Sequence, residues 1–299
     1  MQLFMKMVSL QLIYRKPMLL FNTQLELVSH LSSVSNKETK VGFVPTMGAL
    51  HAGHLSLLEE SVKNNNVNVI SIFVNPTQFT NAEDLAKYPK TLEADIEKIK
   101  TVSDSIIVFA PSVDDIYEGK TVSQHFDFDG LENQMEGKFR PGHFDGVGTI
   151  VKRLFEIVKP TNAYFGEKDF QQLQIVKKMV EKNKMPVKVI GRPIFREANG
   201  LAMSSRNERL TSAERKEAEI IYKTIKKAKE LFKTQSAAAV SKFVGDAFQN
   251  HPVFELEYFQ IADEATLLPC IRKNKTKKYR AFIAVFVNKI RLIDTISLN

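Results

Sequence analysis

The sequence is poor in the features that define several protein classes. It has one cysteine, Cys270, so no disulfide can form within the chain, and we expect a reducing, cytoplasmic setting. No apolar run approaches the ~20 residues of a membrane-spanning helix. Residues 1–21 are interrupted by Lys6, Arg15 and Lys16 and are followed by no small-residue cleavage site. The lack of such a run argues against a membrane protein. The sequence also has no internal repeat and none of the usual serine-hydrolase motifs, which argues against a repeat protein and a serine hydrolase.

The composition suits a protein of about two domains that binds anions. The chain has 299 residues, of which 43% are hydrophobic, enough for two cores. Its net charge of +8 favours nucleotides, phosphates or RNA as partners, although an ordinary lysine-rich surface gives the same charge. We expect an α/β domain with a Rossmann-like parallel sheet at residues 18–193 and a smaller α+β lid domain at 194–299. Residues 1–17 are interpreted as an extension or a mis-assigned start.

Residues 41–59 combine a strand, a glycine turn and the start of a helix. The apolar run Val41–Val44 predicts a buried strand, which Pro45 is expected to end. Gly48 allows a tight turn in a backbone region closed to other residues. From Leu50 onward the apolar spacing becomes helical. The pattern therefore predicts strand, turn and helix in direct succession.

His51 and His54 make the start of this helix a candidate phosphate site. They are three residues apart, so both rings can lie on one face, beside free backbone N–H groups and partial positive charge. Imidazoles there can donate hydrogen bonds to phosphoryl oxygens, and Gly53 is expected to leave room for a ligand between them. Structural histidines or a metal site are the alternatives. Zinc usually takes a third and a fourth ligand, and none stands nearby in the sequence.

Polar residues also follow the next strand. Val67–Val74 predicts that strand, and strand–helix–strand order implies a parallel sheet with ligands beyond the carboxyl ends of its strands. Asn75 and Gln78 lie at that end, and their amides suit hydroxyls and carboxylates, although a capped turn has the same composition. Thr91 is a candidate cap for a further helix, in which Asp95 is a candidate magnesium ligand or an ordinary helix charge.

The middle of the chain contains a candidate flap over an anion. Ile106–Phe109 predicts a third strand and His125–Phe128 an edge strand. Residues 135–147 hold glycines, a proline and basic residues that include Arg140, which is typical of a mobile basic loop and equally of an ordinary surface loop. Val147–Val158 predicts an amphipathic helix after it.

The strand–glycine–helix pattern recurs at residues 163–180. Lys168 therefore stands at the carboxyl end of a strand, where its ammonium can neutralise phosphate charge. Asp169 can hold that ammonium or bind a ribose hydroxyl, and Gln172 is expected one turn into the helix, facing the same cleft. Val187–Ile190 predicts the last strand of this sheet.

Beyond Pro193 the pattern changes to a loop followed by helices and strands. Residues 196–207 offer hydroxyls, backbone N–H groups and Arg206 for phosphate, or form a helix-capping loop. The expected elements are helices at 212–233 and 237–248, strands at 253–261 and 280–287, a hairpin turn at 288–289 and a strand at 290–293. The basic residues of 272–280 predict a solvated loop, with an RNA contact as the alternative.

Two of these motifs resemble known signatures. Residues 45–54 read PTMGALHAGH, and His-x-Gly-His after a first strand resembles the signature of the nucleotidyltransferase superfamily related to class I aminoacyl-tRNA synthetases. Residues 203–207, MSSRN, resemble the second nucleotide motif of that superfamily. With the motifs in the same order, nearly everything after about Met18 resembles the pantothenate synthetase family.

The resemblance implies an ATP-dependent ligase. In that family ATP and pantoate give an enzyme-bound pantoyl-adenylate and pyrophosphate, and the amine of β-alanine then attacks to give pantothenate and AMP. Magnesium and a homodimer are implied as well. Matched by motif, His54 is the proton donor with His51 beside it, and Lys168 and Arg206 supply charge. The implied ATP contacts are Met47, Gly48, Ala49, Leu50, His51, Ala52, Gly53, His54, Gly166, Glu167, Lys168, Asp169, Phe195, Met203, Ser204, Ser205 and Arg206.

The small substrates are matched to glutamines. Gln78 and Gln172 correspond to pantoate contacts, and Gln78 also to a β-alanine contact. Asp95 is matched to magnesium and Arg140 to the flap. The two glutamines argue against another HxGH-type nucleotidyltransferase, because a phosphomonoester would want Arg or Lys there. A synthetase-derived RNA-binding protein is the other alternative, but the sequence has no aromatic-rich RNA motif, so we expect neither nucleic acid nor membrane as partner.

Overall fold

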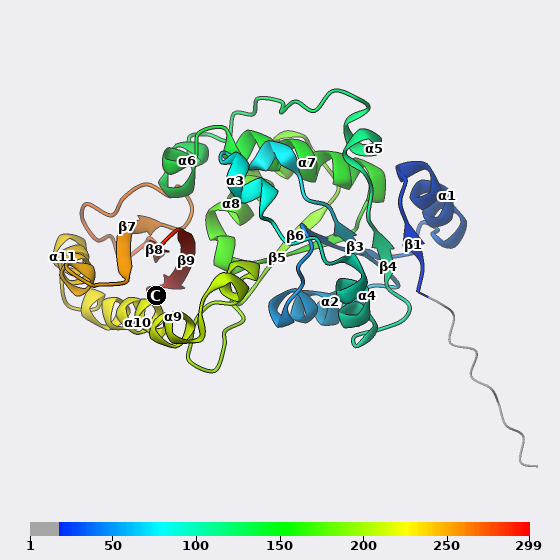
Figure 1. Cartoon of the computed structure of the whole chain (residues 1–299). Coiled ribbons are helices and arrows are strands. Elements are labelled where there is room, and N and C mark those ends of the chain that lie inside the picture. The colour runs from blue at the N-terminus through cyan, green and yellow to red at the C-terminus, as the bar shows by residue number, and fades with distance from the viewer. Residues whose placement is uncertain (1–17) are drawn as a thin grey trace, which may run out of the picture.

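The computed structural model describes residues 18–299. The extension predicted at residues 1–17 lies outside the described residues. Within 18–299, no helix combines the length and the apolar character that crossing a membrane requires. Two separate sheets, each covered by helices, organise this part of the chain (Figure 1).

The larger sheet is parallel, as the strand–helix–strand pattern predicted. Its spatial order is β1-β4-β3-β2-β5-β6, so the strand order reverses direction between β2 and β5, the place where ligands bind in such sheets. Its strands are β1 (Leu20–Phe21), β2 (Val41–Thr46), β3 (Val67–Ile72), β4 (Ile107–Phe109), β5 (Asn162–Gly166) and β6 (Lys188–Arg192).

Helices cover both faces of this sheet, and β2 supplies residues to both cores. Phe43 and Val44 are fully buried, but Phe43 belongs to one hydrophobic core and Val44 to the other, because successive residues of a strand point to opposite faces. The helices that contribute to the first core are α1 (Gln24–Val34), α7 (His143–Val158) and α8 (Phe170–Lys182), and those of the second are α2 (Ala52–Asn64) and α4 (Leu92–Lys100).

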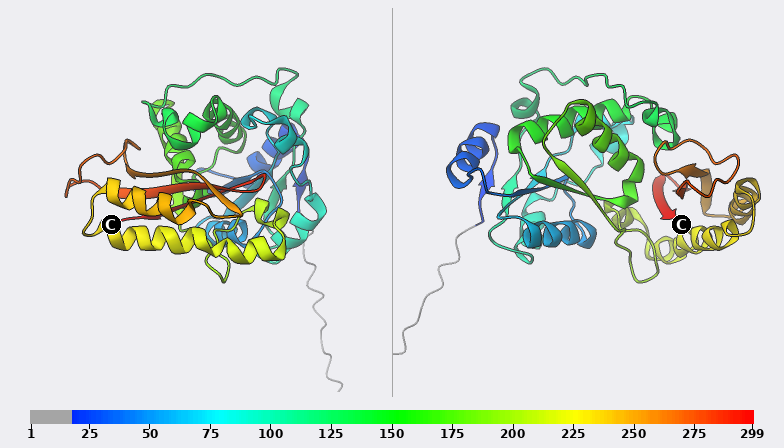
Figure 2. Two further views of the ribbon diagram at one scale, coloured as in Figure 1. Left: turned by 60° about the vertical axis from the view of Figure 1, so that its left-hand side comes forward. Right: turned by 180° about the vertical axis from the view of Figure 1, so that it is seen from behind.

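The smaller sheet is antiparallel and lies at the carboxyl end of the chain. Its order is β7-β8-β9, and Asn288 and Lys289 form the predicted hairpin turn between β8 and β9. Two helices share a hydrophobic core with it and lie alongside it (Figure 2). The elements are β7 (Phe254–Asp263), β8 (Tyr279–Val287), β9 (Ile290–Ser297), α10 (Glu219–Phe232) and α11 (Ala237–Phe248).

Short helices connect these layers and bring the polar residues of the site together. The α-helical ones are α3 (Ala82–Ala86), α5 (Val113–Tyr117), α6 (Met135–Phe139) and α9 (Ser212–Glu217). The 3₁₀ helices are η1 (Pro76–Gln78), η2 (Leu131–Asn133), η3 (Glu167–Asp169) and η4 (Ser205–Arg209).

Pro45 does not end β2, contrary to the prediction. The strand continues to Thr46 and stays paired with β3 throughout. On its other side β5 pairs only with Gly42 and Phe43. The outer part of β2 therefore has no second neighbouring strand, and a residue without an N–H group is tolerated there.

The predicted edge strand at residues 125–128 is wrong. The chain there is extended but unpaired: the N–H of Phe126 donates to the Asp145 carboxylate at 3.0 Å instead of to another strand. The rings of Phe126 and Phe128 stack with centroids 5.4 Å apart, and a Cβ on Gly148 of α7 would lie 3.0 Å from both. The apolar alternation therefore reflects packing against α7.

Two helix predictions also need correction. Residues 135–147, predicted as a loop, contain the short helix α6 and the start of α7. The helix expected at 212–233 is broken at Ala218 into α9 and α10. There the carbonyl of Arg215 accepts a hydrogen bond from the Asn199 side chain at 2.9 Å, which replaces a helical one.

Candidate active site

A cleft of about 550 Å³ is lined both by the segments that follow the parallel strands and by the C-terminal sheet. Four of the residues predicted to bind ATP line it: Lys168, Asp169, Ser204 and Arg206. Lys168 and Asp169 also line a neighbouring hollow of about 30 Å³ together with Gln172. Gln172 is the third residue of α8 and lies beside Lys168 in this hollow, and it is not among the residues that line the larger cleft.

The two histidines form the start of α2, as predicted. His51 is the residue before the helix, His54 is in its first turn, and their rings stack with centroids 4.0 Å apart. The backbone N–H of His51 donates to Nδ1 of His54 at 3.3 Å, whereas Nδ1 of His51 has no hydrogen-bond partner among residues 18–299.

Both imidazoles are neutral at pH 7 in this structure. Burial, followed by the positive charge of Lys168, lowers the pKa of His51 to about 4. Burial, followed by the charges of His51 and Lys168, lowers the pKa of His54 below its usual value. The Lys168 ammonium therefore acts on both histidine rings. Lys168 and the two histidines, which are distant in sequence, share one electrostatic environment.

Asp95, predicted as a candidate magnesium ligand, is instead a buried acceptor of hydrogen bonds from backbone N–H groups. Its carboxylate is 0% exposed and accepts hydrogen bonds from the N–H groups of Ala49 at 2.9 Å and Leu50 at 2.7 Å. The hydroxyl of Thr91 adds a third at 3.2 Å. In the described part of the chain, no group of three or more His, Cys, Asp or Glu side chains could hold a metal ion.

At the start of α2 itself, the backbone N–H groups that remain for an anion are those of Ala52 and Gly53. The N–H of Gly48 donates to the Thr46 hydroxyl at 3.2 Å, and Asp95 takes the next two. Ala52 and Gly53 are the first two residues of α2, and their N–H groups have no acceptor among residues 18–299. The start of α2 therefore offers an anion fewer free backbone N–H groups than the predicted segment 47–54 would suggest.

The His51 ring lies over Gly53. A Cβ on Gly53 would lie 2.9 Å from Cε1 of His51 and 3.5 Å from Cβ of Phe195. Gly53 therefore allows the imidazole to lie over the start of α2. Phe195 is 43% exposed, and its carbonyl accepts the N–H of Met203 at 3.0 Å, which joins two predicted ATP-binding segments.

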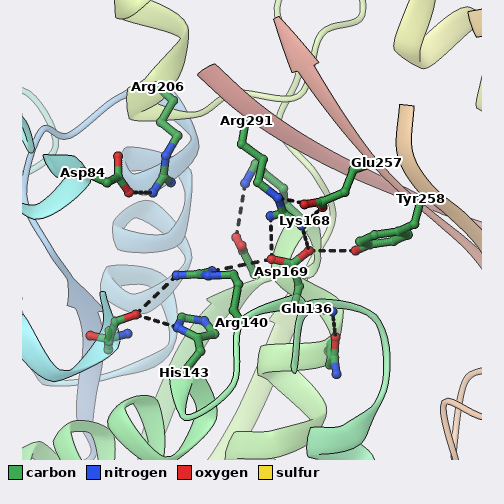
Figure 3. Close-up of polar contacts among 12 residues, drawn as sticks. Asp84, Glu136, Arg140, His143, Lys168, Asp169, Arg206, Glu257, Tyr258 and Arg291 are labelled. Carbon is green, nitrogen blue, oxygen red and sulfur yellow. Dashed lines mark hydrogen bonds and ion pairs between the residues drawn. The ribbon is translucent and has the colours of Figure 1, made fainter. Parts of the chain in front are cut away.

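Arg206 and Lys168 enter the cleft from different 3₁₀ helices (Figure 3). The guanidinium of Arg206 pairs with Asp84 of α3 at 2.7 Å, and Arg209 contacts the same carboxylate at 3.1 Å. The ammonium of Lys168 lies 3.5 Å from Asp169. Arg206, predicted to bind phosphate, is thus held by a carboxylate across the cleft.

Gln78 is fixed through its backbone carbonyl. Arg140 donates to this oxygen at 3.3 Å and His143 at 2.8 Å (Figure 3). Burial, followed by the charge of Arg140, lowers the pKa of His143 to about 4, so the neutral ring donates from Nδ1. The predicted flap residue Arg140 is therefore anchored against a predicted substrate residue.

Asn75 supports the fold and does not face a ligand. It is 0% exposed, accepts a hydrogen bond from the Tyr117 hydroxyl at 2.6 Å and donates to the carbonyl of Gly146 at 3.2 Å. Of the two interpretations of this residue, the capped turn is the one that the structure supports.

Sequence reasoning missed an ion-pair cluster that joins α6 to the C-terminal sheet. Arg291 of β9 donates two hydrogen bonds of 2.8 Å to Glu136, and it also pairs with Glu257 at 2.5 Å (Figure 3). Tyr258 donates to Glu136 at 2.7 Å. Burial alone would raise the pKa of Glu136, but the paired Arg291 outweighs it and the pKa falls to about 2. No local pattern could reveal partners 155 residues apart.

Arg280 is buried and is not part of a solvated basic loop, contrary to the prediction. Its guanidinium pairs with Glu167 at 3.1 Å and Glu264 at 3.0 Å, and it lies 4.0 Å over the ring of Phe170. Glu167, predicted to contact ATP, is therefore held by the C-terminal sheet.

Comparisons with known sequences agree on one family. Residues 19–297 match the family model described as pantoate-beta-alanine ligase. The chain is 65% identical over 281 residues to the pantothenate synthetase of Flavobacterium psychrophilum, covering 94% of this chain and 100% of that protein. It is 51% identical over 282 residues to the pantothenate synthetase of Christiangramia forsetii, with the same coverage of 94% and 100%.

Solved structures give the same result. Pantothenate synthetase from Thermus thermophilus superposes with a TM-score of 0.85 at 39% identity, covering 94% of this chain and 99% of that one. Pantoate-beta-alanine ligase from Francisella tularensis, complexed with beta-gamma ATP and beta-alanine, superposes with a TM-score of 0.74 at 33% identity, covering 94% and 98%.

Proposed function

This chain belongs to the pantoate–β-alanine ligase family, and we propose that the cleft lined by Lys168 and Arg206 is where it carries out the reaction of that family. The enzyme condenses pantoate with β-alanine in an ATP-dependent reaction, through pantoyl-adenylate, and releases AMP and pyrophosphate. One contact carries the placement: a Cβ on Gly53 at the start of α2 would lie 3.5 Å from Cβ of Phe195, whose carbonyl accepts the N–H of Met203, next to Ser204 of the cleft lining. The charge of Lys168, which also lines the cleft, acts on both histidines and supports the same placement.

In the first step the pantoate carboxylate attacks the α-phosphorus of ATP, and the bond to pyrophosphate breaks. Negative charge grows on the phosphoryl oxygens and on the departing pyrophosphate. Lys168 and Arg206 supply positive charge, and the N–H groups of Ala52 and Gly53 supply hydrogen bonds at the positive end of α2. His51 and His54 add neutral N–H hydrogen-bond donors; His54, matched by motif to the family's proton donor, acts here through such a hydrogen bond. Since the substrate carboxylate is the nucleophile, the chain needs no Ser or Cys in that role.

In the second step the amine of β-alanine attacks the acyl carbon of the adenylate, and AMP leaves. Gln78 and Gln172 hold pantoate in this proposal, and Gln78 also faces β-alanine. The hollow shared by Gln172, Lys168 and Asp169 supports the first assignment. The remaining ATP contacts are proposed along two segments, Gly166–Asp169 and Met203–Arg206, together with Phe195 and the turn at Met47–Leu50.

Magnesium enters this proposal through the triphosphate. Mg²⁺ is commonly bound by substrate phosphates and one or two carboxylates, and it neutralises their charge when bound. Asp95 has both carboxylate oxygens engaged by the chain, so we assign no step to a protein-held metal. We further propose a cytoplasmic homodimer in which residues 194–299 act as a lid domain over residues 18–193.

The assignment is tested by AMP formation with pantoate or β-alanine omitted in turn. We expect AMP only with both acids present, and pantoate-dependent pyrophosphate exchange without β-alanine. Lys168→Ala and His54→Ala should each lower the exchange rate by roughly a hundredfold, because each removes one stabilising group from the charged transition state. Lys242→Ala, at an exposed helix position, is the control. Exchange by Lys168→Ala at close to the wild-type rate would refute the placement of the site.

A further inference from the structure

We propose that Asp95 is a positioning residue for the adenylation step, acting from α4 on the turn before α2. This inference rests on the proposed function and adds to it a residue that touches no substrate. It concerns how the N–H groups of Ala52 and Gly53, and the His51 ring beside them, are directed towards the cleft.

Asp95 and Lys98 together engage three polar backbone groups of the turn. Asp95 accepts the N–H groups of Ala49 and Leu50 at 2.9 and 2.7 Å. Lys98, one helical turn further along α4, donates to the carbonyl of Leu50 at 2.6 Å. His51 follows immediately and is the residue at which α2 begins. Contacts from α4 therefore hold the turn that joins β2 to α2.

The turn needs such support because its backbone is strained. Gly48 has a φ of +83° and Ala49 a φ of +50°, and the second is unfavourable for a residue with a side chain. A Cβ on Gly48 would lie 3.2 Å from Oδ2 of Asp95 and 3.1 Å from Ile72. Strained backbone of this kind persists only where the surroundings hold it in place, and the buried carboxylate of Asp95 is the group that does so.

The same two α4 side chains also shape the electrostatics of the start of α2. With Asp95 and Thr46 engaging the N–H groups of residues 48–50, the positive end of α2 is confined to Ala52 and Gly53. The charge of Lys98 contributes to the lowered pKa of both His51 and His54, after burial and Lys168. α4 thus holds the turn that leads to these groups and adds a smaller contribution to the electrostatics of the two imidazoles.

Asp95→Asn tests the proposal, because Asn keeps the shape and one acceptor but presents an NH₂ group to the second backbone N–H. We expect kcat/KM for ATP in pantoate-dependent pyrophosphate exchange to fall by about tenfold or more, through a displaced turn. KM for ATP should rise while KM for pantoate stays within about twofold of wild type. Excess Mg²⁺ should not restore the activity, since the carboxylate positions backbone and does not bind metal.

Ser61→Ala is the matched control. Ser61 is 0% exposed on the same helix α2 and donates to Asn68 at 2.6 Å, so its loss lowers stability without reaching the turn. Its kinetic constants should stay within about twofold of wild type. If Asp95→Asn does not fold, Lys98→Met removes only the ammonium on Leu50 and should raise KM for ATP by about threefold.

Three results overturn the proposal: a folded Asp95→Asn variant with wild-type kcat/KM, its rescue by Mg²⁺, or, where Asp95→Asn cannot be purified, Lys98→Met with an unchanged KM for ATP. A wild-type enzyme without pantoate-dependent exchange instead overturns the proposed function, so the two failures are distinguishable.

Discussion

At the scale of single residues, His143 shows what burial does to a titrating group. It is 7% exposed, and its pKa of about 4 lies below the usual value of 6.5. As the pH falls, the unfolded chain therefore binds the proton first, and stability present above pH 6.5 is lost towards pH 4. We expect this one group to account for roughly 2–3 kcal/mol between pH 7 and about pH 4.5. His143→Asn keeps a donor for the Gln78 carbonyl, cannot titrate, and should reduce the acid loss by that amount in urea unfolding.

His125→Asn is the control for this experiment. His125 is exposed, and its pKa is raised by hydrogen bonding to Asp145. Any contribution of His125 to the free energy of unfolding is therefore present at low pH and is lost as the pH rises, which is opposite to the contribution of His143. The acid loss of this variant should match that of wild type. Some loss should persist in His143→Asn, because His51 and His54 also have lowered pKa values. An identical acid loss in His143→Asn and wild type contradicts the prediction.

Single residues also mark where sequence reasoning stops. The spacing of His51 and His54, and the place of Lys168 after a strand, follow from local periodicity and from the rule that ligands meet the carboxyl ends of parallel strands. Asp95 was expected at the start of a helix, and it is there. Whether it faces solvent or the turn at Gly48 depends on how α4 packs against residues far away in sequence, which no local pattern records.

At the scale of elements, the Glu136–Arg291 pair couples α6 to β9. Both side chains are largely buried, with 11% and 18% exposed. Removing Arg291 leaves Glu136 with only the more distant Arg140, at 3.5 Å, and takes from Glu257 its ion-pair partner. We expect Arg291→Met to lower the free energy of unfolding by about 3–5 kcal/mol. In Arg291→Met the pKa of Glu136 should rise, since burial alone favours the protonated acid. Denaturant unfolding at pH 7 measures the first effect.

Two further variants separate this buried pair from ordinary charge effects. Adding Glu136→Gln to Arg291→Met should recover part of the stability, because only one of the two carboxylates that lost Arg291, that of Glu257, remains charged. Lys242→Met breaks an exposed pair with Asp246 on α11 and should change stability by less than about 1 kcal/mol. Equal losses for Arg291→Met and Lys242→Met would mean that the cluster contributes no more than a surface pair.

The elements themselves were largely predictable, and their errors share a cause. Apolar runs identified β2, β3 and β5, because a strand buried on both faces leaves a continuous apolar stretch. The wrong predictions are those in which tertiary contacts override local pattern. Phe126 and Phe128 alternate because they pack on α7, the break at Ala218 follows from a hydrogen bond by Asn199, and the glycine-rich residues 135–147 fold because Glu136 meets Arg291.

At the scale of the whole molecule, three contacts span the parts of the chain that line the cleft. Glu136 pairs with Arg291, Glu167 with Arg280, and Asp84 with Arg206. The arginines of the first two pairs, Arg291 and Arg280, are 18% and 7% exposed, whereas Arg206 of the third pair is 28% exposed and lines the cleft. A partly exposed ion pair stabilises by about 1 kcal/mol or less, so the Asp84 contact is the one that a triphosphate can most readily displace.

Binding of ATP by Arg206 therefore competes with Asp84. We expect Asp84→Asn to free Arg206 and to lower KM for ATP by about two- to fivefold with kcat unchanged, because the released pair energy is about 1 kcal/mol or less. Steady-state pyrophosphate exchange measures this. Glu83→Gln removes the same charge from the neighbouring position of α3, where Glu83 pairs only with the exposed Lys87 among residues 18–299, and it separates competition from a general change in potential. A KM for ATP that rises in Asp84→Asn but not in Glu83→Gln would mean that Asp84 orients Arg206 for ATP and does not compete with it.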